Sequence, residues 1–455
     1  MKKHFTILSL CVFMSLTFLF SCAYSDKESG GLTSETAVTA ESPVTTPSVE
    51  TEIPVTAQTT TKKQTPTISI KTEGRRPINS DTEYISATVS LEKSEGEDFK
   101  NYPAQIRGRG NSTWMYFDKK PYRLKFDFGV DLFGMGQNRD YVLLANAMDM
   151  SQFNNYAAFT LAQIFGLKYN FQCKFVNLVV NGQYEGLYLL TEQIEIGKNR
   201  IDIDDNGSKS VDTSYLVEFG GGGSKNEKHI FKMRPVIVGG EIHEWRKEFR
   251  GAVKYPDETV CTEKQLEFIS NYVNEVNAAI FRKDFKRFCE LCDLDSFVAN
   301  VLVNEIALAS DFDWNFYMFK EKGGKLYLGP VWDFAQGYGI STKNGSTFEG
   351  LTVSKFPCWI TELLKMPEFY EAARKKWIEC YDDIHALPDH LIEKSVELSE
   401  DIENNFLRHD VLGKPYWRQT PDTAEYVTYD EFLDRLVFWL DNRLIWLDDY
   451  FKVKK

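Results

Sequence analysis

Long apolar runs are almost absent from this 455-residue sequence. The clearest one lies near the N-terminus, from Phe5 to Phe20, and is shorter than the roughly 20 apolar residues that a membrane-spanning helix needs. No later segment has the pattern of a membrane span. We therefore expect the working part of the chain to be a soluble domain.

An excess of basic residues is also lacking. Lys and Arg number 53 against 66 Asp and Glu, so the formal net charge is −13. This acidic balance argues against nucleic-acid binding as the main role, because nucleic-acid partners select basic surfaces. It is compatible with a basic protein substrate.

Paired metal-binding cysteines are missing as well. Of the eight cysteines, two lie in the first 22 residues and the other six are scattered. Cys289 and Cys292 form a lone CxxC, whereas a zinc site needs about four ligands and a redox motif needs a thioredoxin-like setting. We expect buried or free thiols.

The N-terminus has the pattern of an export signal. Lys2 and Lys3 precede the apolar run, which ends in Leu-Phe-Ser and then Cys22. This ending resembles a lipobox, which implies that residues 1–21 are a signal peptide and that Cys22 carries a lipid. The protein is then expected to be exported and held by that lipid at the outer face of the bacterial cell membrane. The alternative is an ordinary signal peptide with a chance cysteine.

The composition changes after Cys22. Ser, Thr, Pro, Val and Glu dominate residues 22–65, which have no aromatic residue after Tyr24. Such a segment cannot bury enough apolar surface to offset its ordering entropy. We expect a disordered tether, followed by a domain over residues 66–455.

Within this domain, strand patterns precede helix patterns. Short alternating runs continue to about Ala104, and later strands are expected at Phe175–Val180, 186–190 and 215–219, the first two joined by an Asn181-Gly182 turn. A helix is expected to start at Asp149-Met150-Ser151, and residues after Thr262 are mostly helical apart from a hairpin over 316–328. This order predicts an α+β fold, with a mostly antiparallel β part before a mainly helical part.

Acidic and amide side chains gather around that hairpin. Asp311, Asp313 and Asn315 follow a predicted helix, and the hairpin returns the chain to Asp333. Oxygen ligands of this kind suit Mg²⁺ bound to a phosphate, as in protein kinases. The alternative is structural, because Asp is common in turns and caps.

Basic side chains gather on two other strands, next to glycines that let backbone N–H groups approach a ligand. They could hold polyphosphate, although no Walker or GxGxxG pattern is present, or they could form a solvated strand face. The cluster consists of Arg107, Arg109, Lys119, Lys120, Arg123 and Lys125.

Several longer motifs resemble the CotH family of spore-coat protein kinases and their exported relatives. The resemblance covers about residues 66–453 and includes the run Arg-Gly-Arg-Gly-Asn-Ser-Thr-Trp. The matching segments, in order, are 107–114, 119–125, 132–135, 141–146, 181–194, 325–334 and 439–448. The resemblance implies an atypical protein-kinase-like fold that transfers phosphate from ATP, with Mg²⁺ or Mn²⁺, to Ser or Thr of a protein.

The same resemblance implies roles for individual residues. Asp311 is expected to be the catalytic base, with Asn315 and Asp333 as metal ligands. Arg107, Lys120, Arg123 and Lys125 are candidates for holding nucleotide phosphates. Glu192 is expected to orient one of these cations, with Glu218 as a weaker candidate.

The resemblance leaves other functions open. Asn154 and Ala335 stand where many relatives carry Arg and a second Asp, so a catalytically weak or inactive module is the main alternative. Such a module would bind a cell-surface partner, and the 14% aromatic content suits contact with sugar or protein. A metal-dependent hydrolase that uses the same acidic cluster is a third reading.

Overall fold

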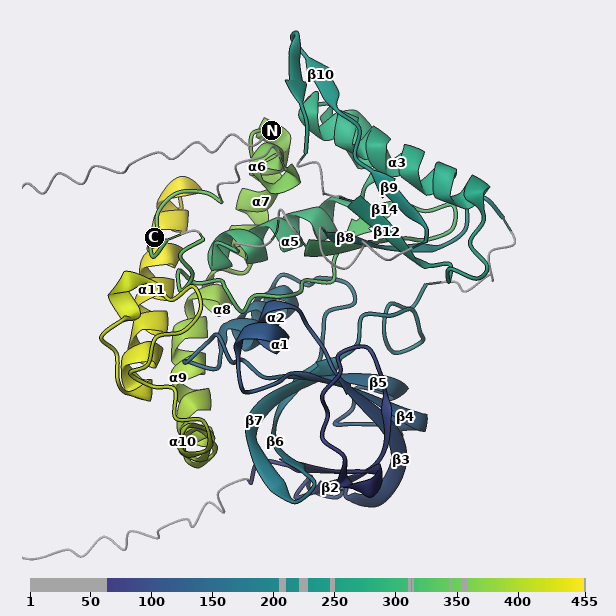
Figure 1. Ribbon diagram of the computed structural model, residues 1–455. Helices are drawn as coiled ribbons and strands as arrows, with labels where there is room; N and C mark the ends of the chain where they lie inside the picture. The colour runs from purple at the N-terminus through teal and green to yellow at the C-terminus, as the bar shows by residue number, and fades with distance from the viewer. Residues whose placement is uncertain are drawn as a thin grey trace, which may run out of the picture. The chain divides into compact units, whose positions relative to one another are not determined.

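Two structural parts follow one another along the chain, a β-barrel and a mainly helical part with its own sheet (Figure 1). The computed structural model describes residues 64–203, 210–220, 228–245, 250–309, 312, 315–343, 345–352 and 358–453. All of them lie within one unit, Thr61–Lys455, defined by its internal contacts. The predicted signal peptide and most of the predicted tether lie outside the described residues.

The first part is a closed seven-stranded barrel. All neighbouring strands pair antiparallel except β1 and β6, which pair parallel and close the ring. Around the barrel the strands are β1 (Thr67–Thr72), β2 (Ile85–Glu92), β3 (Phe99–Gly108), β4 (Tyr122–Asp131), β5 (Gln137–Leu144), β7 (Gln183–Glu192) and β6 (Cys173–Val180). The predicted β part is thus confirmed.

Strand alternation fills the interior of this barrel. On β4, Tyr122, Leu124 and Phe126 are buried, whereas Arg123 and Lys125 between them are partly exposed, as the two-residue period predicts. The turn between β6 and β7 is made by Asn181 and Gly182, both with positive φ, which suits a two-residue hairpin loop.

The first long helix starts later than predicted. α2 spans Asn154–Ile164, not Asp149 onward. Residues 146–152 form turns instead, with positive φ at Asn146 and Gln152. The Asp149 carboxylate accepts hydrogen bonds from the backbone N–H groups of Ser151 and Asn154, at 3.0 and 2.7 Å, so Asp149 stabilises the turn that leads into the helix.

The second part contains a five-stranded sheet in the order β14-β13-β8-β12-β9. Three of its strands were expected, β8 (Tyr215–Gly220), β13 (Asn315–Lys320) and β14 (Leu326–Leu328). β9 (Ile230–Lys232), β12 (Arg250–Tyr255) and the separate hairpin of β10 (Val236–Val238) and β11 (Glu241–His243) were not expected. β9, β10 and β11 have three residues each, and the sequence of β12 does not alternate between apolar and polar residues. Since β13 pairs with β8, about 100 residues earlier, the hairpin at 315–328 is part of a larger sheet.

Helices make up most of the remaining chain, which confirms the α+β class. Side-chain N-caps are formed by Thr262 with Gln265 on α3, Asp284 on α4, Asp293 on α5, and Thr428 with Glu431 on α11. The helices are α1 (Ser112–Tyr116), α3 (Glu263–Phe281), α4 (Phe285–Leu291), α5 (Leu294–Ala307), α6 (Trp359–Leu363), α7 (Pro367–Glu379), α8 (Tyr381–His385), α9 (Leu387–Glu397), α10 (Ser399–Arg408) and α11 (Tyr429–Tyr450). Short 3₁₀ turns are η1 (Glu73–Arg75) and η3 (Pro421–Thr423).

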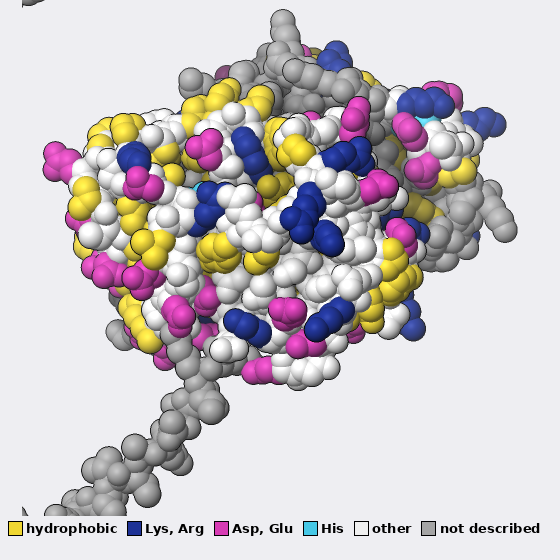
Figure 2. Space-filling model, turned by 60° about the horizontal axis from the view of Figure 1, so that its bottom comes forward, with side chains coloured by type: hydrophobic (Ala, Val, Ile, Leu, Met, Phe, Trp, Pro, Cys, Tyr) yellow, Lys and Arg dark blue, Asp and Glu magenta, His cyan; other side chains and the backbone are white. Residues whose placement is uncertain are grey.

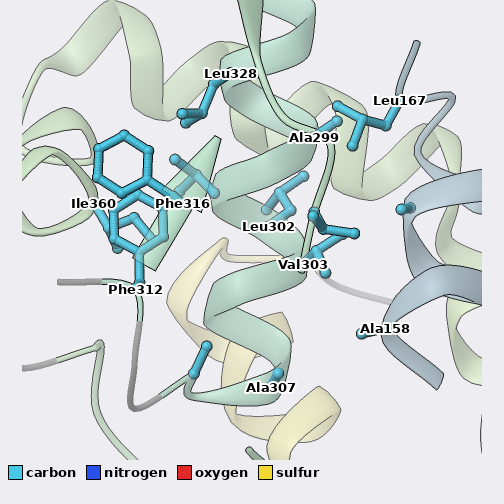
Figure 3. Close-up of a cluster of buried hydrophobic side chains, with 14 of the residues drawn as sticks. Ala158, Leu167, Ala299, Leu302, Val303, Ala307, Phe312, Phe316, Leu328 and Ile360 are labelled. Atoms are coloured by element: carbon cyan, nitrogen blue, oxygen red, sulfur yellow. The ribbon is translucent and has the colours of Figure 1, made fainter. Parts of the chain in front are cut away.

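The core of the second part surrounds α5 (Figure 3). Nearly every residue of this helix is buried, which explains why its sequence has only a weak polar face. The rings of Phe312 and Phe316 lie parallel, with centroids 4.9 Å apart and an interplanar angle of 6°, near Ile360 (Figure 3). Phe312 therefore fixes the chain in the core between the end of α5 and the start of β13.

Charges of both signs are interspersed on the face shown in Figure 2. Within the described part of the chain, none of the helices combines the length and apolarity that crossing a membrane requires. The six cysteines of this part are free thiols, as expected, and Cys289 and Cys292 form no disulfide.

Candidate functional site

A cleft of about 530 Å³ lies where segments of both parts meet. Its walls include the glycine-containing segment after β3 (residues 109–113), the segment after β5 (145–148), and the strand residues Glu218 and Tyr317. Trp332 and Asp333, which follow β14, complete this part of the wall. The volume is in the range of small-molecule sites, and several polar groups converge on it.

Arg109 is a cation of this cleft. The centre of its guanidinium lies 5.1 Å from the centroid of the Trp332 ring, a cation–π distance. Burial lowers the pKa of Arg109, while the negative charge of Asp333 opposes that shift. Among the described residues, the Arg109 guanidinium has no carboxylate within ion-pair distance and no hydrogen-bond partner.

Asp333 lies in the same cleft in an unusual backbone conformation. Its φ is +67°, in the left-handed region that favours glycine, so the conformation costs free energy that the surrounding structure must offset. One contact that holds the next residue is the hydrogen bond from the Phe334 backbone N–H to the Asn155 side-chain oxygen, at 3.0 Å. The Asp333 side chain is exposed to the cleft.

Glu218 and Tyr317 form a second polar pair in the wall. They face each other in register on β8 and β13. Burial raises the pKa of Tyr317 well above its usual value, and its charge and hydrogen-bond interactions with Glu218 raise it further. Lys254, on β12, lies 3.4 Å from the Glu218 carboxylate, so this acid is already partly neutralised.

Residues 106–447 match the protein family described as CotH kinase protein. The match covers 342 of the 455 residues. The chain belongs to the CotH kinase family. A comparison with curated proteins gave no match.

The CotH match spans most of the predicted site residues, but the predicted phosphate-binding cations do not line the cleft. Arg107 donates to the backbone oxygens of Gly108, at 2.8 Å, and of Asp81. Lys120 donates to the Trp114 oxygen at 2.6 Å, and Arg123 pairs with Asp140 at 2.7 Å. Lys125 is partly exposed on β4. Their part in nucleotide binding remains a prediction.

Glu192 lines a second cavity, of about 370 Å³, whose wall also includes Phe171 and Pro330. Its carboxylate forms a buried ion pair with Arg200 and accepts a hydrogen bond from the Gln172 backbone N–H at 2.9 Å. Burial raises the pKa of Glu192, and the Arg200 charge opposes the shift. The cation that Glu192 orients in this structure is therefore Arg200, not a member of the predicted cluster.

Other predicted site residues are not tested. Asp311, Asp313 and Cys22 lie outside the described residues, as does the Asn315 side chain, although the Asn315 backbone pairs with Gly220. Within the described ranges, no group of three or more His, Cys, Asp and Glu side chains could hold a metal ion. The predicted Mg²⁺ site therefore remains a prediction in which Asp333 is the one described side chain.

The two positions where the resemblance implied other residues, Asn154 and Ala335, contact or belong to the chain segment after Asp333. Ala335 lines the cleft two residues further on, where a second Asp would add a carboxylate to the wall. Asn154 is fully buried at the start of α2, and its Nδ2 is 3.5 Å from the Gly337 backbone oxygen. Its Oδ1 has no hydrogen-bond partner within the described part of the chain.

Arg107 does not line the cleft, whereas Arg109, which belongs to the same predicted cation cluster, does. Tyr317 was not among the predicted site residues. Both arginines stand in the same glycine-containing motif, but β3 ends at Gly108, so Arg109 leaves the strand and enters the cleft. The end of β3 at Gly108 could have indicated that Arg109 enters the cleft, because a side chain just beyond a strand is not held to the face of the strand.

Proposed function

We propose that this cleft binds ATP with Mg²⁺ and that the protein is a kinase-like phosphotransferase acting on Ser or Thr of proteins. We further propose that it works outside the cytoplasm, anchored through Cys22. Membership of the CotH kinase family supports the general class. The activity, the kinase-like fold and the anchoring belong to the proposal.

The single observation that carries the proposal is the cation of Arg109 in the cleft. Burial of this guanidinium is costly, and the Asp333 charge offsets only part of that cost, because the pKa of Arg109 stays lowered. A bound polyphosphate would supply further negative charge. Arginine suits this task because its fork of N–H groups matches phosphate oxygens. The ring of Trp332 keeps the guanidinium in place at a distance of 5.1 Å.

The remaining roles follow from the chemistry of phosphoryl transfer. Asp333 and Asn315 would hold Mg²⁺, which would supply positive charge against the phosphates. Asp311 accepts the proton of the substrate hydroxyl. The hydroxyl oxygen bonds to the terminal phosphorus of ATP, and ADP leaves. Arg109 stabilises the negative charge of the phosphates during this step.

A second candidate function is a binding module without catalysis. Ala335 favours it, because this residue lies in the cleft wall and contributes no carboxylate there. Such a protein would keep the cleft for a nucleotide or another ligand and would attach the cell surface to a partner.

Phosphate transfer by the full-length protein tests the proposal. We expect transfer of labelled phosphate from ATP to a Ser-rich basic protein in Mg²⁺ or Mn²⁺, abolished in Asp333→Asn and Asp311→Asn. Asp127→Asn is the control, because Asp127 is exposed on β4 and does not line the cleft. At a ligand concentration of about 100 times Kd, ATP should stabilise the fold by about 2.7 kcal/mol.

The possible outcomes separate the two functions. Stabilisation by ATP without transfer would support the binding module and overturn the kinase assignment. Absence of any ATP-induced rise in Tm, with or without metal, would overturn nucleotide binding altogether.

A further inference from the structure

One face of the C-terminal helix α11 carries three donors at intervals of four residues, Arg435, Trp439 and Arg443. Each donates to backbone oxygens of the chain segment that follows Asp333. Arg435 donates to the oxygens of Tyr338 and Gly339, at 2.8 and 2.6 Å. Trp439 donates to the oxygens of Ser346 and Thr347, both at 3.2 Å. Arg443 donates to the oxygens of Phe348 and Gly350, at 2.8 and 2.6 Å.

The recipient segment needs these partners. Residues 338–343 and 345–350 form no helix and no named strand, so most of their backbone oxygens have no partner from regular secondary structure. Residues 338–341 are buried, so their backbone groups must find hydrogen bonds elsewhere, whereas Ser346 and Thr347 are exposed. Gly339 is suited to the contact, since a Cβ added there would lie 2.4 Å from the Trp439 indole nitrogen.

The donors on α11 are themselves held in place. All three side chains are buried. Arg443 pairs with Glu305 of α5 at 3.2 Å, and Arg435 pairs with Asp422 at 3.0 Å. Because buried guanidinium groups are costly without charged partners, these ion pairs make the donor positions well defined.

The segment forms part of the cleft wall. Gln336 and Lys343, both in the chain after Asp333, line the cleft. The Gln336 side-chain oxygen accepts from Arg418 at 2.8 Å, and the Thr342 N–H donates to the Arg418 backbone oxygen at 3.1 Å. Arg418 also lines the cleft, so two stretches of its wall are joined through this segment.

We infer that Arg435, Trp439 and Arg443 are positioning residues that hold the segment after Asp333 in the path by which it walls the cleft. Their catalytic importance rests on the proposed function, whereas the positioning itself does not. In many protein kinases the segment after the metal-binding Asp is ordered by phosphorylation. Here the segment receives hydrogen bonds from α11 instead.

Hydrogen exchange of the full-length protein tests the inference without any assay of activity. Trp439→Phe keeps a buried ring but removes the indole donor. Trp377→Phe is the matched control, since Trp377 is equally buried and its indole donates to Asp448, away from the segment. We expect exchange of the amides in residues 338–350 to become about tenfold faster in Trp439→Phe only, as loss of its two hydrogen bonds predicts.

A second pair of variants guards against a general loss of folding. Arg435→Met should accelerate exchange in the same residues, and Arg435→Lys, which keeps one charged donor, should restore part of the protection. In a transfer assay, Trp439→Phe should raise KM for ATP more than it lowers kcat, whereas Trp377→Phe should change neither.

Unchanged exchange in Trp439→Phe, or equal acceleration in Trp377→Phe, would overturn the inference. If neither the wild-type protein nor any variant transfers phosphate, the proposed function is wrong. The positioning role is still supported in that case if exchange in residues 338–350 is faster in Trp439→Phe only.

Discussion

Asn155 and Phe334, 179 residues apart, are joined by a hydrogen bond of 3.0 Å from the Phe334 N–H to the Asn155 side-chain oxygen. The start of α2 thereby holds the residue that follows Asp333. A second contact, from the Asn155 side-chain amide to the Asn146 oxygen at 3.2 Å, orients the Asn155 side chain. The strained backbone of Asp333 is thus supported from a distant part of the chain.

Asn155→Ala should remove the hydrogen bond that holds Phe334, the residue after Asp333. The variant leaves the buried N–H of Phe334 without an acceptor, which costs about 1–3 kcal/mol. We expect a lower Tm together with a loss of ATP-induced stabilisation. The control is Asn274→Ala, since Asn274 also accepts from a backbone N–H, that of Arg234, but does not line the cleft. It should lower Tm and keep the ATP response; an equal ATP response in both variants would contradict the role of Asn155.

Arg109→Met should weaken nucleotide binding more than Arg107→Met. Loss of one charged hydrogen-bond partner costs about 1.5–3 kcal/mol, which corresponds to a Kd about 10 to 150 times higher. Arg107 is bonded to backbone oxygens outside the cleft, so its variant should bind ATP with little change. Calorimetric titration with ATP measures both values, and the reverse order would favour the phosphate role first predicted for Arg107.

Glu192→Gln should affect stability without affecting nucleotide binding. Breaking the buried pair with Arg200 costs about 3–5 kcal/mol, because it leaves the guanidinium without its charged partner. The double variant Glu192→Gln, Arg200→Met should recover part of this loss. Chemical denaturation measures the stability, and ATP-induced shifts in Tm measure binding. A selective loss of the ATP response would instead support the predicted role of Glu192 in the nucleotide site.

Lys119 should make stability depend on pH above neutrality. Its amine is buried, donating to the Leu187 backbone oxygen at 2.6 Å, and burial lowers its pKa from 10.5 to about 7. Between these pH values the unfolded chain binds a proton that the folded chain does not. Raising the pH from 7 to 8 should therefore increase the free energy of unfolding by up to about 1.4 kcal/mol.

Denaturation of Lys119→Met at pH 6, 7 and 8 isolates this contribution. The difference between wild type and variant should be constant below pH 7 and should grow in favour of the wild type above it. The control is Lys100→Met, because Lys100 is exposed on β3. Parallel stability curves for wild type and Lys119→Met would show that the amine keeps its proton on folding.

Much of the secondary structure could be predicted, because it depends on residues that are near one another in the sequence. The alternation of Tyr122, Leu124 and Phe126 predicted a strand with one buried face, and the Asn181-Gly182 pair predicted the hairpin turn. The start of α2 was predicted too early. Asp149 has the residue type of a helix cap, but it lies in a turn five residues before Asn154, where the helix begins. The strands between 230 and 255 were missed, because β9, β10 and β11 have three residues each and the sequence of β12 does not alternate between apolar and polar residues.

The site was predicted only in part. Motif resemblance identified the family and singled out Asp333, which lines the cleft, whereas which arginine enters the cleft depended on where β3 ends. The partner of Glu192 could not be predicted, since Arg200 is one of many basic residues and only folding brings its side chain to that carboxylate.

By itself, the sequence determined the acidic balance, the α+β order, the local strand and helix periods, and the motifs of the CotH kinase family. Tertiary structure alone decided the parallel pairing of β1 with β6, the Asn155–Phe334 contact and the support of the Asp333 segment by α11. The reason is physical: periodicity and capping act over a few residues, whereas these contacts join groups about 100 residues apart or more, and they form only when the whole core packs.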